Sequence, residues 1–404
     1  MSGALEGLKV LDLTRMLAGP FCTMLMADQG ADIIKVEPPG GDGTRFMVPY
    51  PKELEGRPPY GGYFQSINRG KRSIGIDLKE EAGKAVLRHL VADVDVLVEN
   101  FRVGVMDRLG LGYEQLAEIN PKLVYAAIRG FGDPRTGESP YKDWPAYDVI
   151  AQAMGGMVGI TGPDASSPMK IGPGVGDTLP ATLTAFGIMA AVYRANKTGE
   201  GQFIDVAMYD AVLAFCERII YQHSYIGDVP HPEGNAHPLL CPFGIFPAKD
   251  GWVSVACPGE NFWGFLAKAM GREDMIDDPR YRTNNDRAAH GAEVVEAVSA
   301  WTAEHTKDEL TEILGGQIPY GPVNDVTDIY RDPHVRARGM LVEVEQPGID
   351  RKVTIAGTPI HMLGTPGGVK RRSPLLGEHT DEVLAEFGFS REDIDALKAD
   401  KVVI

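Results

Sequence analysis

The sequence predicts an α/β protein in which a mostly parallel sheet, covered by helices on both faces, is followed by a smaller α+β domain. Short apolar runs alternate with helical patterns through the first two hundred residues. Such alternation is typical of doubly wound sheets, because a helix forms the crossover between neighbouring parallel strands. After about residue 225 the alternation stops, and proline and glycine become frequent. The length of 404 residues likewise favours two domains over one.

The first part of the large domain is expected over residues 1–225. Apolar runs that predict strands lie at 8–13, 31–36, 73–78, 94–98, 123–128 and 203–206. Helical patterns lie at 18–29, 80–91, 148–157 and 180–194. Gly30 follows the first of these helices, at a position where glycine commonly ends a helix.

The smaller domain is expected over residues 226–325. It opens with a stretch at 227–242 that contains four prolines, which indicates a linker or a long loop. A hairpin and three helices follow, with strands at 244–246 and 252–256 and helices at 262–270, 292–305 and 307–314. Thr306 and Glu309 form a capping-box pattern at the start of the last helix. Residues 326–404 are predicted to return to the large domain, with β-rich patterns at 340–360 and helices at 381–387 and 391–399.

Composition excludes several classes of protein. The formal net charge is −16, from 40 basic and 56 acidic residues, so general binding to nucleic acid or to an anionic membrane is not expected. The four cysteines have no CxxC or zinc-like spacing, which favours a reduced, cytoplasmic protein over a disulfide framework. No signal peptide and no membrane-length apolar stretch is apparent.

Common cofactor and metal motifs are missing from the sequence. The first loop, TRMLAGP, carries neither a GxGxxG fingerprint nor a P-loop, and the glycines at 40–43 match neither pattern. A nucleotide-dependent dehydrogenase is therefore disfavoured. There is no GxSxG, HExxH or EF-hand pattern either, so neither a serine hydrolase nor a metal site is expected.

Four basic residues lie near the ends of predicted strands. Lys71 precedes the strand at 73–78 and Lys79 follows it, while Arg102 and Arg108 come after the strand at 94–98. Open α/β sheets bind ligands beyond the carboxyl ends of their strands, which favours the last three over Lys71. These cations are candidates to hold the phosphates of an anionic ligand, although ordinary solvated surface charge explains them equally well.

Asp177 is the candidate nucleophile. Four of the six residues before it are glycine or proline, and a long apolar helix follows. One interpretation is structural: Asp177 or Thr178 caps that helix, with Pro180 in its first turn. The other is chemical, since a substrate can approach a carboxylate closely beside a glycine-rich loop, where backbone N–H groups at 174–176 could stabilise an oxyanion. The pattern leaves both interpretations open.

Several long motifs resemble the class III CoA-transferases, also called the CaiB/BaiF family. They span about residues 5–404 in order and are VLDLTRMLAGPFCTMLMADQGADIIKVEPP, NRGKRSIGIDL, VENFRVGVMDRLGLGYEQL, YDVIAQAMGGM, GVGDTLPATLTAFGIMAAVYRANKTGEGQFIDVAMYDAVL, QIPYGPVND and SPLLGEHTDEVL. The resemblance implies transfer of CoA from an acyl-CoA to a free acid through a thioester on Asp177. It also implies a Rossmann-like large domain built from both chain ends, a small inserted domain, and an interlocked homodimer.

The resemblance assigns CoA contacts to individual positions. They are Arg15 and Met16 in the first loop, Lys71 and Lys79, Asn100 and Phe101, Arg108 and Leu109, and Met208. An arginine that is common after the second strand is replaced by Pro38, so Arg45 is a candidate substitute. CoA enters as part of the substrate, and no permanently bound cofactor is implied.

One departure separates the two main activities of the family. Racemases that resemble this chain carry a histidine immediately before the aspartate of YDVIAQAMGGM, where this chain has Tyr147 followed by Asp148. A phenol is a poor proton shuttle at neutral pH, which favours a transferase over an α-methylacyl-CoA racemase or epimerase. A non-catalytic acyl-CoA-binding protein is the remaining alternative. The glycine-rich flap of formyl-CoA transferase has no clear counterpart, because the segment at 257–261 is much shorter.

Overall fold

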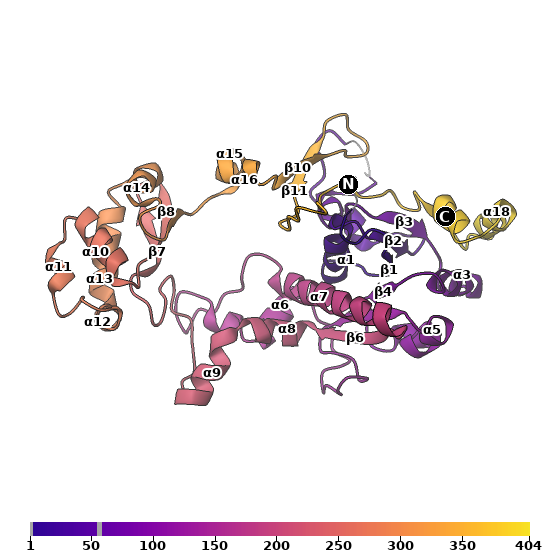
Figure 1. Ribbon diagram of the computed structural model, residues 1–404, viewed down its shortest axis with the longest axis horizontal. Helices are drawn as coiled ribbons and strands as arrows, with labels where there is room; N and C mark the ends of the chain where they lie inside the picture. The colour runs from indigo at the N-terminus through magenta and orange to yellow at the C-terminus, as the bar shows by residue number, and fades with distance from the viewer. Residues whose placement is uncertain (1–2, 55–58) are drawn as a thin grey trace. The chain divides into compact units, whose positions relative to one another are not determined.

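The computed structural model describes residues 3–54 and 59–404, and the chain divides into two compact units (Figure 1). The first unit comprises the residues up to 157 together with 171–220 and 334–404. The second unit comprises 158–170 and 221–333, whereas the sequence analysis placed the smaller domain at 226–325. The segment 158–170 is separated from the rest of its unit in sequence, so no local pattern could assign it.

A six-stranded parallel sheet forms the centre of the first unit, in the order β3-β2-β1-β4-β5-β6. Its strands are β1 (Lys9–Asp12), β2 (Asp32–Glu37), β3 (Arg72–Gly75), β4 (Val96–Glu99), β5 (Val124–Arg129) and β6 (Gln202–Ala207). Leu11 of β1 pairs with Ile34 on one side and Leu97 on the other. The strand order therefore reverses between β1 and β4, which is the switch point where such sheets bind ligands. The predicted α/β fold class is confirmed.

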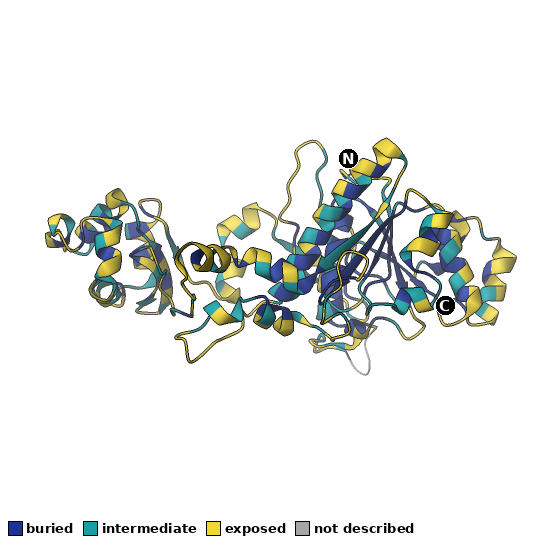
Figure 2. Cartoon of the chain, turned by 90° about the horizontal axis from the view of Figure 1, so that it is seen from below, coloured by how far each residue is buried: buried dark blue, intermediate teal, exposed yellow. Residues whose placement is uncertain are grey.

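Helices cover both faces of this sheet, because successive residues of a strand point to opposite sides. Val10 packs with Ala18 and Ile188 in one core, whereas the next residue, Leu11, packs with Leu87 and Val383 in the other. Figure 2 shows buried residues along the strands and exposed residues along the outer faces of the helices. The helices of this unit are α1 (Ala18–Asp28), α2 (Gly62–Asn68), α3 (Glu81–Val91), α4 (Val105–Arg108), α5 (Tyr113–Ile119), α6 (Asp148–Met154), α7 (Val175–Thr198), α8 (Met208–Phe215), α17 (Thr380–Glu386) and α18 (Arg391–Ala399).

Helix α7 differs most from its predicted bounds. It begins at Val175 rather than at 180 and runs for 24 residues to Thr198. Pro180 is the sixth residue of this helix, after the N–H of Thr178 has already found its intrahelical acceptor, the carbonyl of Gly174, at 3.0 Å. Because proline has no N–H, the carbonyl of Gly176 lacks its usual donor four residues on. By length and composition α7 could cross a membrane, but Ala181, Ile188 and Ala191 are buried in the core of the unit. We therefore interpret α7 as a core helix.

The second unit is built around a three-stranded antiparallel sheet, in the order β7-β8-β9. Its strands are β7 (Phe243–Ala248), β8 (Gly251–Ala256) and β9 (Tyr320–Pro322), and its helices include α10 (Glu260–Ala269), α11 (Asp274–Asp277), α12 (Asn284–Ala289), α13 (Gly291–Thr302), α14 (Lys307–Leu314) and α15 (Val326–Arg331). The expected hairpin is confirmed, as is the capping box of Thr306 and Glu309. Trp263 is fully buried against Leu266 and Val298, which makes a core separate from those of the first unit.

Candidate active site

A pocket of about 350 Å³ opens beyond the carboxyl ends of β1, β4 and β5 in the first unit. We call it the switch-point pocket. Seven of the candidate residues named from the sequence line it, namely Arg15, Met16, Asn100, Phe101, Arg102, Asp177 and Met208. They come from the loops after β1 and β4 and from the first turns of α7 and α8. The fold thus brings the candidate nucleophile into one cavity with five of the expected CoA contacts.

A second pocket, of about 260 Å³, lies beyond the carboxyl ends of β2 and β3 and contains Lys79 and Leu109. Arg15, Gly43 and Phe101 line both pockets, so the two cavities are neighbours. Arg108 lines neither pocket and is exposed at the end of α4, next to Leu109. Seven of the nine predicted CoA contacts therefore line one or both of two adjoining cavities, and Lys71 and Arg108 line neither.

The loops after β1 and β4 are tied together at the switch point. The N–H of Arg15 donates to Oδ1 of Asn100 at 2.9 Å, and Nδ2 of Asn100 donates back to the carbonyl of Arg15 at 2.7 Å. The guanidinium of Arg15 lies 5.3 Å from the centre of the Phe101 ring. Met16 adopts φ +67°, a left-handed conformation that bulky residues rarely hold without support. The reciprocal amide bonds supply that support from the neighbouring strand.

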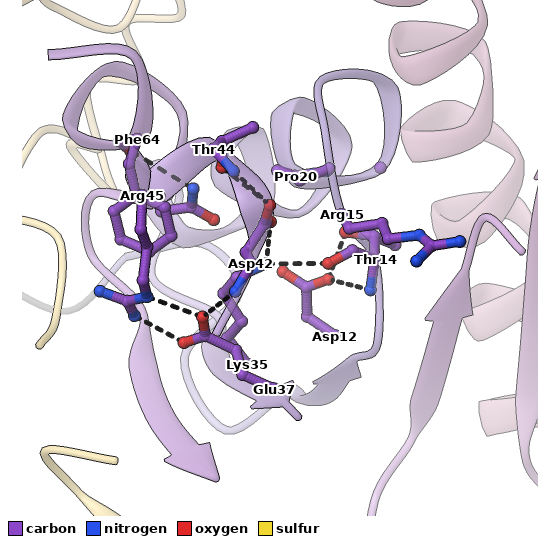
Figure 3. Close-up of polar contacts among 12 residues, drawn as sticks. Asp12, Thr14, Arg15, Pro20, Lys35, Glu37, Asp42, Thr44, Arg45 and Phe64 are labelled. Atoms are coloured by element: carbon purple, nitrogen blue, oxygen red, sulfur yellow. Dashed lines mark hydrogen bonds and ion pairs between the residues drawn. The ribbon is translucent and has the colours of Figure 1, made fainter. Parts of the chain in front are cut away.

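Beneath the Arg15 loop lies a buried cluster of charges, made of Asp12, Lys35, Asp42 and Lys71. Lys35 Nζ donates to the carbonyl of Thr14 at 2.8 Å and lies 3.1 Å from Asp42 Oδ2. Lys71 Nζ pairs with Asp12 Oδ2 at 2.9 Å. Figure 3 shows the Arg15 side chain pointing away from this cluster. The cluster contains two cations and two anions, so its charges balance.

Two basic residues that were candidates for binding CoA belong to this buried interior. Lys71 is fully buried, and its ammonium is occupied by Asp12, the carbonyl of Pro20 and Oδ1 of Asn68. Arg45 is 1% exposed and makes a two-bond pair with Glu37 at 2.6 and 2.8 Å (Figure 3). Neither lines the two pockets, because each is needed to neutralise a buried carboxylate. Lys79 and Arg15, which are exposed, keep their charges available.

The environment of the Asp177 carboxyl group is the opposite of that of the paired carboxylates in the buried cluster. Its carboxyl group has no hydrogen-bond or ion-pair partner among the described residues, although the residue is half-buried. Burial raises the pKa of Asp177, and the nearby carboxylate of Asp148 raises it further, to about 7. The same two carboxylates act on Tyr63 of α2, whose pKa is raised chiefly by burial and then by Asp177.

Asp177 does not cap its own helix. Helix α7 starts two residues earlier, and its N-cap residue, Gly174, has no side chain to offer. The cap comes instead from Asp148 at the start of α6, whose Oδ1 accepts the N–H of Gly176 at 2.8 Å. A carboxylate at a helix N-terminus satisfies a free N–H and interacts favourably with the helix dipole. The structural interpretation of Asp177 as a cap is therefore wrong, and its oxygens remain free to react.

The expected oxyanion donors are largely occupied. Val175 donates its N–H to the carbonyl of Pro173 at 2.8 Å, and Gly176 donates to Asp148. Of the three N–H groups at 174–176, this leaves Gly174 without an acceptor among the described residues. At Gly176 an added Cβ would lie 2.4 Å from the carbonyl oxygen of Asp148, so the backbones of α6 and α7 touch at this point.

Sequence reasoning missed the roles of Asp148 and Gln152. Gln152 is fully buried, and its Nε2 lies 2.8 and 3.0 Å from the two carboxylate oxygens of Asp148. The spacing of four residues in YDVIAQAMGGM places both side chains on one face of a helix, a signal that was present in the sequence. Their partners before Asp177 are Ile171, 19 positions after Gln152, and Gly176, 28 positions after Asp148, and no local pattern identifies either.

A cluster of metal-binding side chains is not found at this site. Among residues 3–54 and 59–404, no group of three or more His, Cys, Asp or Glu side chains is placed to hold a metal ion.

Comparison with known proteins identifies the family. The model of CoA-transferase family III matches residues 5–380. The chain belongs to CoA-transferase family III. It is 48% identical to a succinyl-CoA:mesaconate CoA-transferase of Haloarcula hispanica, over 96% of this chain and 97% of the relative. It is 40% identical to a succinate–glutarate CoA-transferase of Agrobacterium fabrum, with 95% of each chain covered.

A solved structure agrees with this assignment. The crystal structure of a CAIB/BAIF family protein from Brucella suis has a TM-score of 0.83 and 35% identity, and it covers 96% of this chain and 100% of its own. The family III chain is an acyl-CoA:carboxylate CoA-transferase, and CoA reaches it as part of a substrate. The resemblance stated from the motifs is confirmed.

Proposed function

We propose that this CoA-transferase takes CoA from succinyl-CoA and passes it to a short dicarboxylic acid through a thioester on Asp177. The observation that carries the proposal is the carboxyl group of Asp177, which lines the switch-point pocket and has no hydrogen-bond or ion-pair partner among residues 3–54 and 59–404, because Asp148 supplies the helix cap. The names of the similar enzymes support succinyl-CoA as donor and a dicarboxylic acid such as mesaconate or glutarate as acceptor.

The proposed reaction has two symmetrical halves. The Asp177 carboxylate attacks the thioester carbonyl, a C–O bond forms, and the C–S bond breaks to release CoA thiolate. The thiolate then attacks the aspartyl carbonyl of the anhydride, which gives an aspartyl-CoA thioester and free succinate. The acceptor carboxylate repeats both steps in reverse and restores Asp177. No net proton is consumed, and covalent catalysis replaces one difficult exchange by easier steps.

The raised pKa of Asp177 suits this role. A carboxylate with a pKa of about 7 is a better nucleophile than an ordinary aspartate, while a large fraction of it is still ionised near neutral pH. Placement also contributes, since a well-oriented neighbouring group lowers the barrier by roughly 7–11 kcal/mol relative to a bimolecular reaction. The proposal therefore requires only an ionised, fixed carboxylate.

The two adjoining pockets support a binding mode for the CoA ester. We propose that the switch-point pocket takes the thioester end, because it contains Asp177. The second pocket takes the nucleotide end, where Lys79 offers a positive charge and Leu109 an apolar surface. Arg15 and Phe101 line both cavities and would contact the ester where it passes between them.

The proposal is tested by trapping the intermediate. The enzyme is incubated with succinyl-CoA, quenched with hydroxylamine or borohydride, digested and mapped by mass spectrometry, with acceptors supplied in parallel as mesaconate, glutarate, oxalate and acetate. We expect the modification on Asp177 and the fastest transfer to a dicarboxylic acid of four or five carbons. A modification on any other residue would defeat the covalent assignment, and faster transfer to acetate would defeat the acid class.

Two rival functions are separated by simple assays. A racemase would exchange the α-hydrogen of a 2-methylacyl-CoA with solvent deuterium, whereas a transferase exchanges labelled free acid into the acyl-CoA. A non-catalytic binding protein would bind CoA esters equally well after D177A and would turn over nothing. Tyr147, at the position of the racemase histidine, lines the pocket, and this supports the transferase.

We further propose a cytoplasmic homodimer. Helix α7 supports the dimer, because Phe186 is 75% exposed and Tyr193 is 63% exposed on the face that the first unit leaves uncovered. Light scattering of the purified protein measures its mass in solution, and a monomer would contradict the proposal. Whether two chains interlock is tested by cross-linking within and between chains.

A further inference from the structure

Gln152 joins the two segments that define the position of Asp177. Its Nε2 donates to both carboxylate oxygens of Asp148, at 2.8 and 3.0 Å, and its Oε1 accepts the N–H of Ile171 at 2.9 Å. Ile171 begins the loop that leads to Asp177, and Asp148 holds the N–H of Gly176 directly before it. One fully buried amide therefore fixes both ends of the loop that presents the nucleophile.

The orientation of this amide is dictated by its two partners. The Asp148 carboxylate only accepts hydrogen bonds and the N–H of Ile171 only donates, so the NH₂ group must face Asp148. No other neutral side chain of this length offers a donor and an acceptor in these directions. Gln152 does not line the switch-point pocket and is out of reach of the CoA ester.

We propose that Gln152 is a positioning residue for the transferase: it holds Asp148 against the start of α7, so that Asp148 caps the helix and Asp177 stays free and directed into the pocket. This inference rests on the proposed role of Asp177 as the carrier of CoA. Without Gln152 the Asp148 carboxylate would lose two hydrogen bonds, and the loop at 171–176 would lose the bond that joins Ile171 to α6. The nucleophile would then sample positions from which it cannot reach the thioester.

The charged groups around Asp177 allow the effect of Gln152 to be measured through the titration of Asp177. The titratable and charged groups that act on it or share its pocket are Asp148, Tyr63, Tyr147, Arg15, Arg102 and Lys142. Arg129 also lines the pocket, but it is paired with Glu99 and Asp133. Of these groups only Asp148 shifts the pKa of Asp177, and it raises that pKa. A change at Gln152 therefore reaches the titration of the nucleophile through Asp148.

The primary test is Gln152→Met, which keeps the volume and removes both hydrogen-bonding functions. We expect kcat for CoA transfer from succinyl-CoA to fall by roughly 10- to 100-fold, because small displacements of a reacting group cost about this much, with KM unchanged within about twofold. The matched control is Gln65→Met in α2. Gln65 is also fully buried and also bonds through both ends of its amide, donating to the carbonyl of Glu345 and accepting from the N–H of Ser373. Both kcat and KM of this control should stay within about twofold of the natural enzyme, at a similar loss of thermal stability.

A second variant tests the positioning role if Gln152→Met does not fold. Gln152→Glu keeps the shape and the acceptor for Ile171 while it adds a carboxyl group beside Asp148. Two carboxyl groups this close share one proton near neutral pH, and the added group ionises only at higher pH, where its repulsion of Asp148 should lower kcat. A kcat of Gln152→Glu that stays level as the pH rises, or a kcat of Gln152→Met within twofold of that of the natural enzyme, overturns the proposal. An equal loss in Gln65→Met also overturns it, because the effect would then be general destabilisation.

Trapping the covalent adduct distinguishes a failure of the positioning role of Gln152 from a failure of the proposed function. If the natural enzyme forms the Asp177 adduct and Gln152→Met forms it at a reduced rate, both stand. If the natural enzyme forms it and Gln152→Met forms it equally fast, only the positioning role fails. If the natural enzyme forms no adduct on Asp177, the proposed function itself fails.

Discussion

Asp12 and Asp177 are aspartates of the same unit, the first fully buried and the second half-buried, and they have opposite surroundings. Burial would raise the pKa of Asp12, but Lys71 and Lys35 lie beside it and lower the pKa to about 2. No cation in the part of the chain that the structure describes lowers the pKa of Asp177; burial raises it, and Asp148 adds to the effect, to about 7. A buried carboxylate that is fully paired stabilises a fold, whereas one that is left unpaired is held ready for chemistry. The contrast distinguishes a structural acid from a reactive one without reference to any relative.

The largest effect is expected from removing the reactive acid. D177A should lower the rate of CoA transfer by at least about 10³-fold, because the enzyme loses its covalent carrier. Initial rates are measured by chromatography of CoA esters. D177N serves as a second variant, with deamidation checked by mass spectrometry. Residual turnover above a tenth of the natural rate would contradict the assignment.

Removing the structural acid should affect folding instead. D12N leaves the buried ammonium of Lys71 without its partner, and we expect a loss of about 3–5 kcal/mol in the free energy of unfolding. Urea titration followed by circular dichroism measures this loss. The control is E81Q, which breaks the exposed pairs of Glu81 with Lys84 and Arg88 and should lower the free energy of unfolding far less than D12N. Equal shifts in the two variants would remove the distinction between the buried cluster and a surface pair.

The same comparison predicts that D177N stabilises the protein. In the unfolded chain an aspartate loses its proton near pH 4, whereas the folded Asp177 keeps it up to about pH 7. The stability of the natural protein therefore falls as the pH rises from 4 to 7, and asparagine avoids this loss. We expect D177N to be more stable by roughly 1–3 kcal/mol at pH 8, with no gain at pH 4. Thermal melts at both pH values measure the difference, and a gain of equal size at pH 4 would exclude the titration as its cause.

A smaller effect is expected from D148N. Asparagine keeps an oxygen that can accept the N–H of Gly176, but it removes the negative charge that raises the pKa of Asp177. The pKa of Asp177 should fall, and the acid limb of the kcat/KM–pH profile should move to lower pH by roughly one unit or less. The ratio of activity at pH 6 to that at pH 8 then rises. A limb that stays in place would mean that burial alone sets the pKa.

The smallest effect concerns the two exposed cations near the second pocket. Lys79 lines this pocket and Arg108 does not. K79A should raise KM for CoA esters about three- to tenfold, while R108A should raise it less, since an exposed contact to phosphate contributes roughly 1 kcal/mol or less. The comparison is made at low and at high salt, and a larger effect of R108A would place the nucleotide nearer α4.

The sequence predicted the sheet well because its signals are local. Apolar runs marked all six parallel strands, and the loops after them contained Arg15, Asn100 and Phe101. The direction in which a side chain points depends on the tertiary structure and is harder to predict from neighbouring residues. Lys71 and Lys79 flank the same strand, and only the fold shows that one enters the interior while the other lines a pocket.

The cap of α7 was misjudged for the same reason. Asp177 stands near the start of a helix, and local patterns favour such residues as caps. The true cap, Asp148, is 28 positions away in sequence, and no spacing rule connects it with Gly176. The free state of Asp177 is thus a property of the tertiary structure, although the residue itself was correctly chosen as the candidate nucleophile.

The contact between the backbones at Gly176 limits which substitutions could change the acid preference of this enzyme. Even a methyl group there would press on the carbonyl of Asp148 and push the following residue out of line. Altered acid preference is therefore more accessible through the loop at 139–147, where Trp144 and Tyr147 border the same cavity and are more than half exposed. Libraries aimed at new acceptors should vary that loop and leave the glycine untouched.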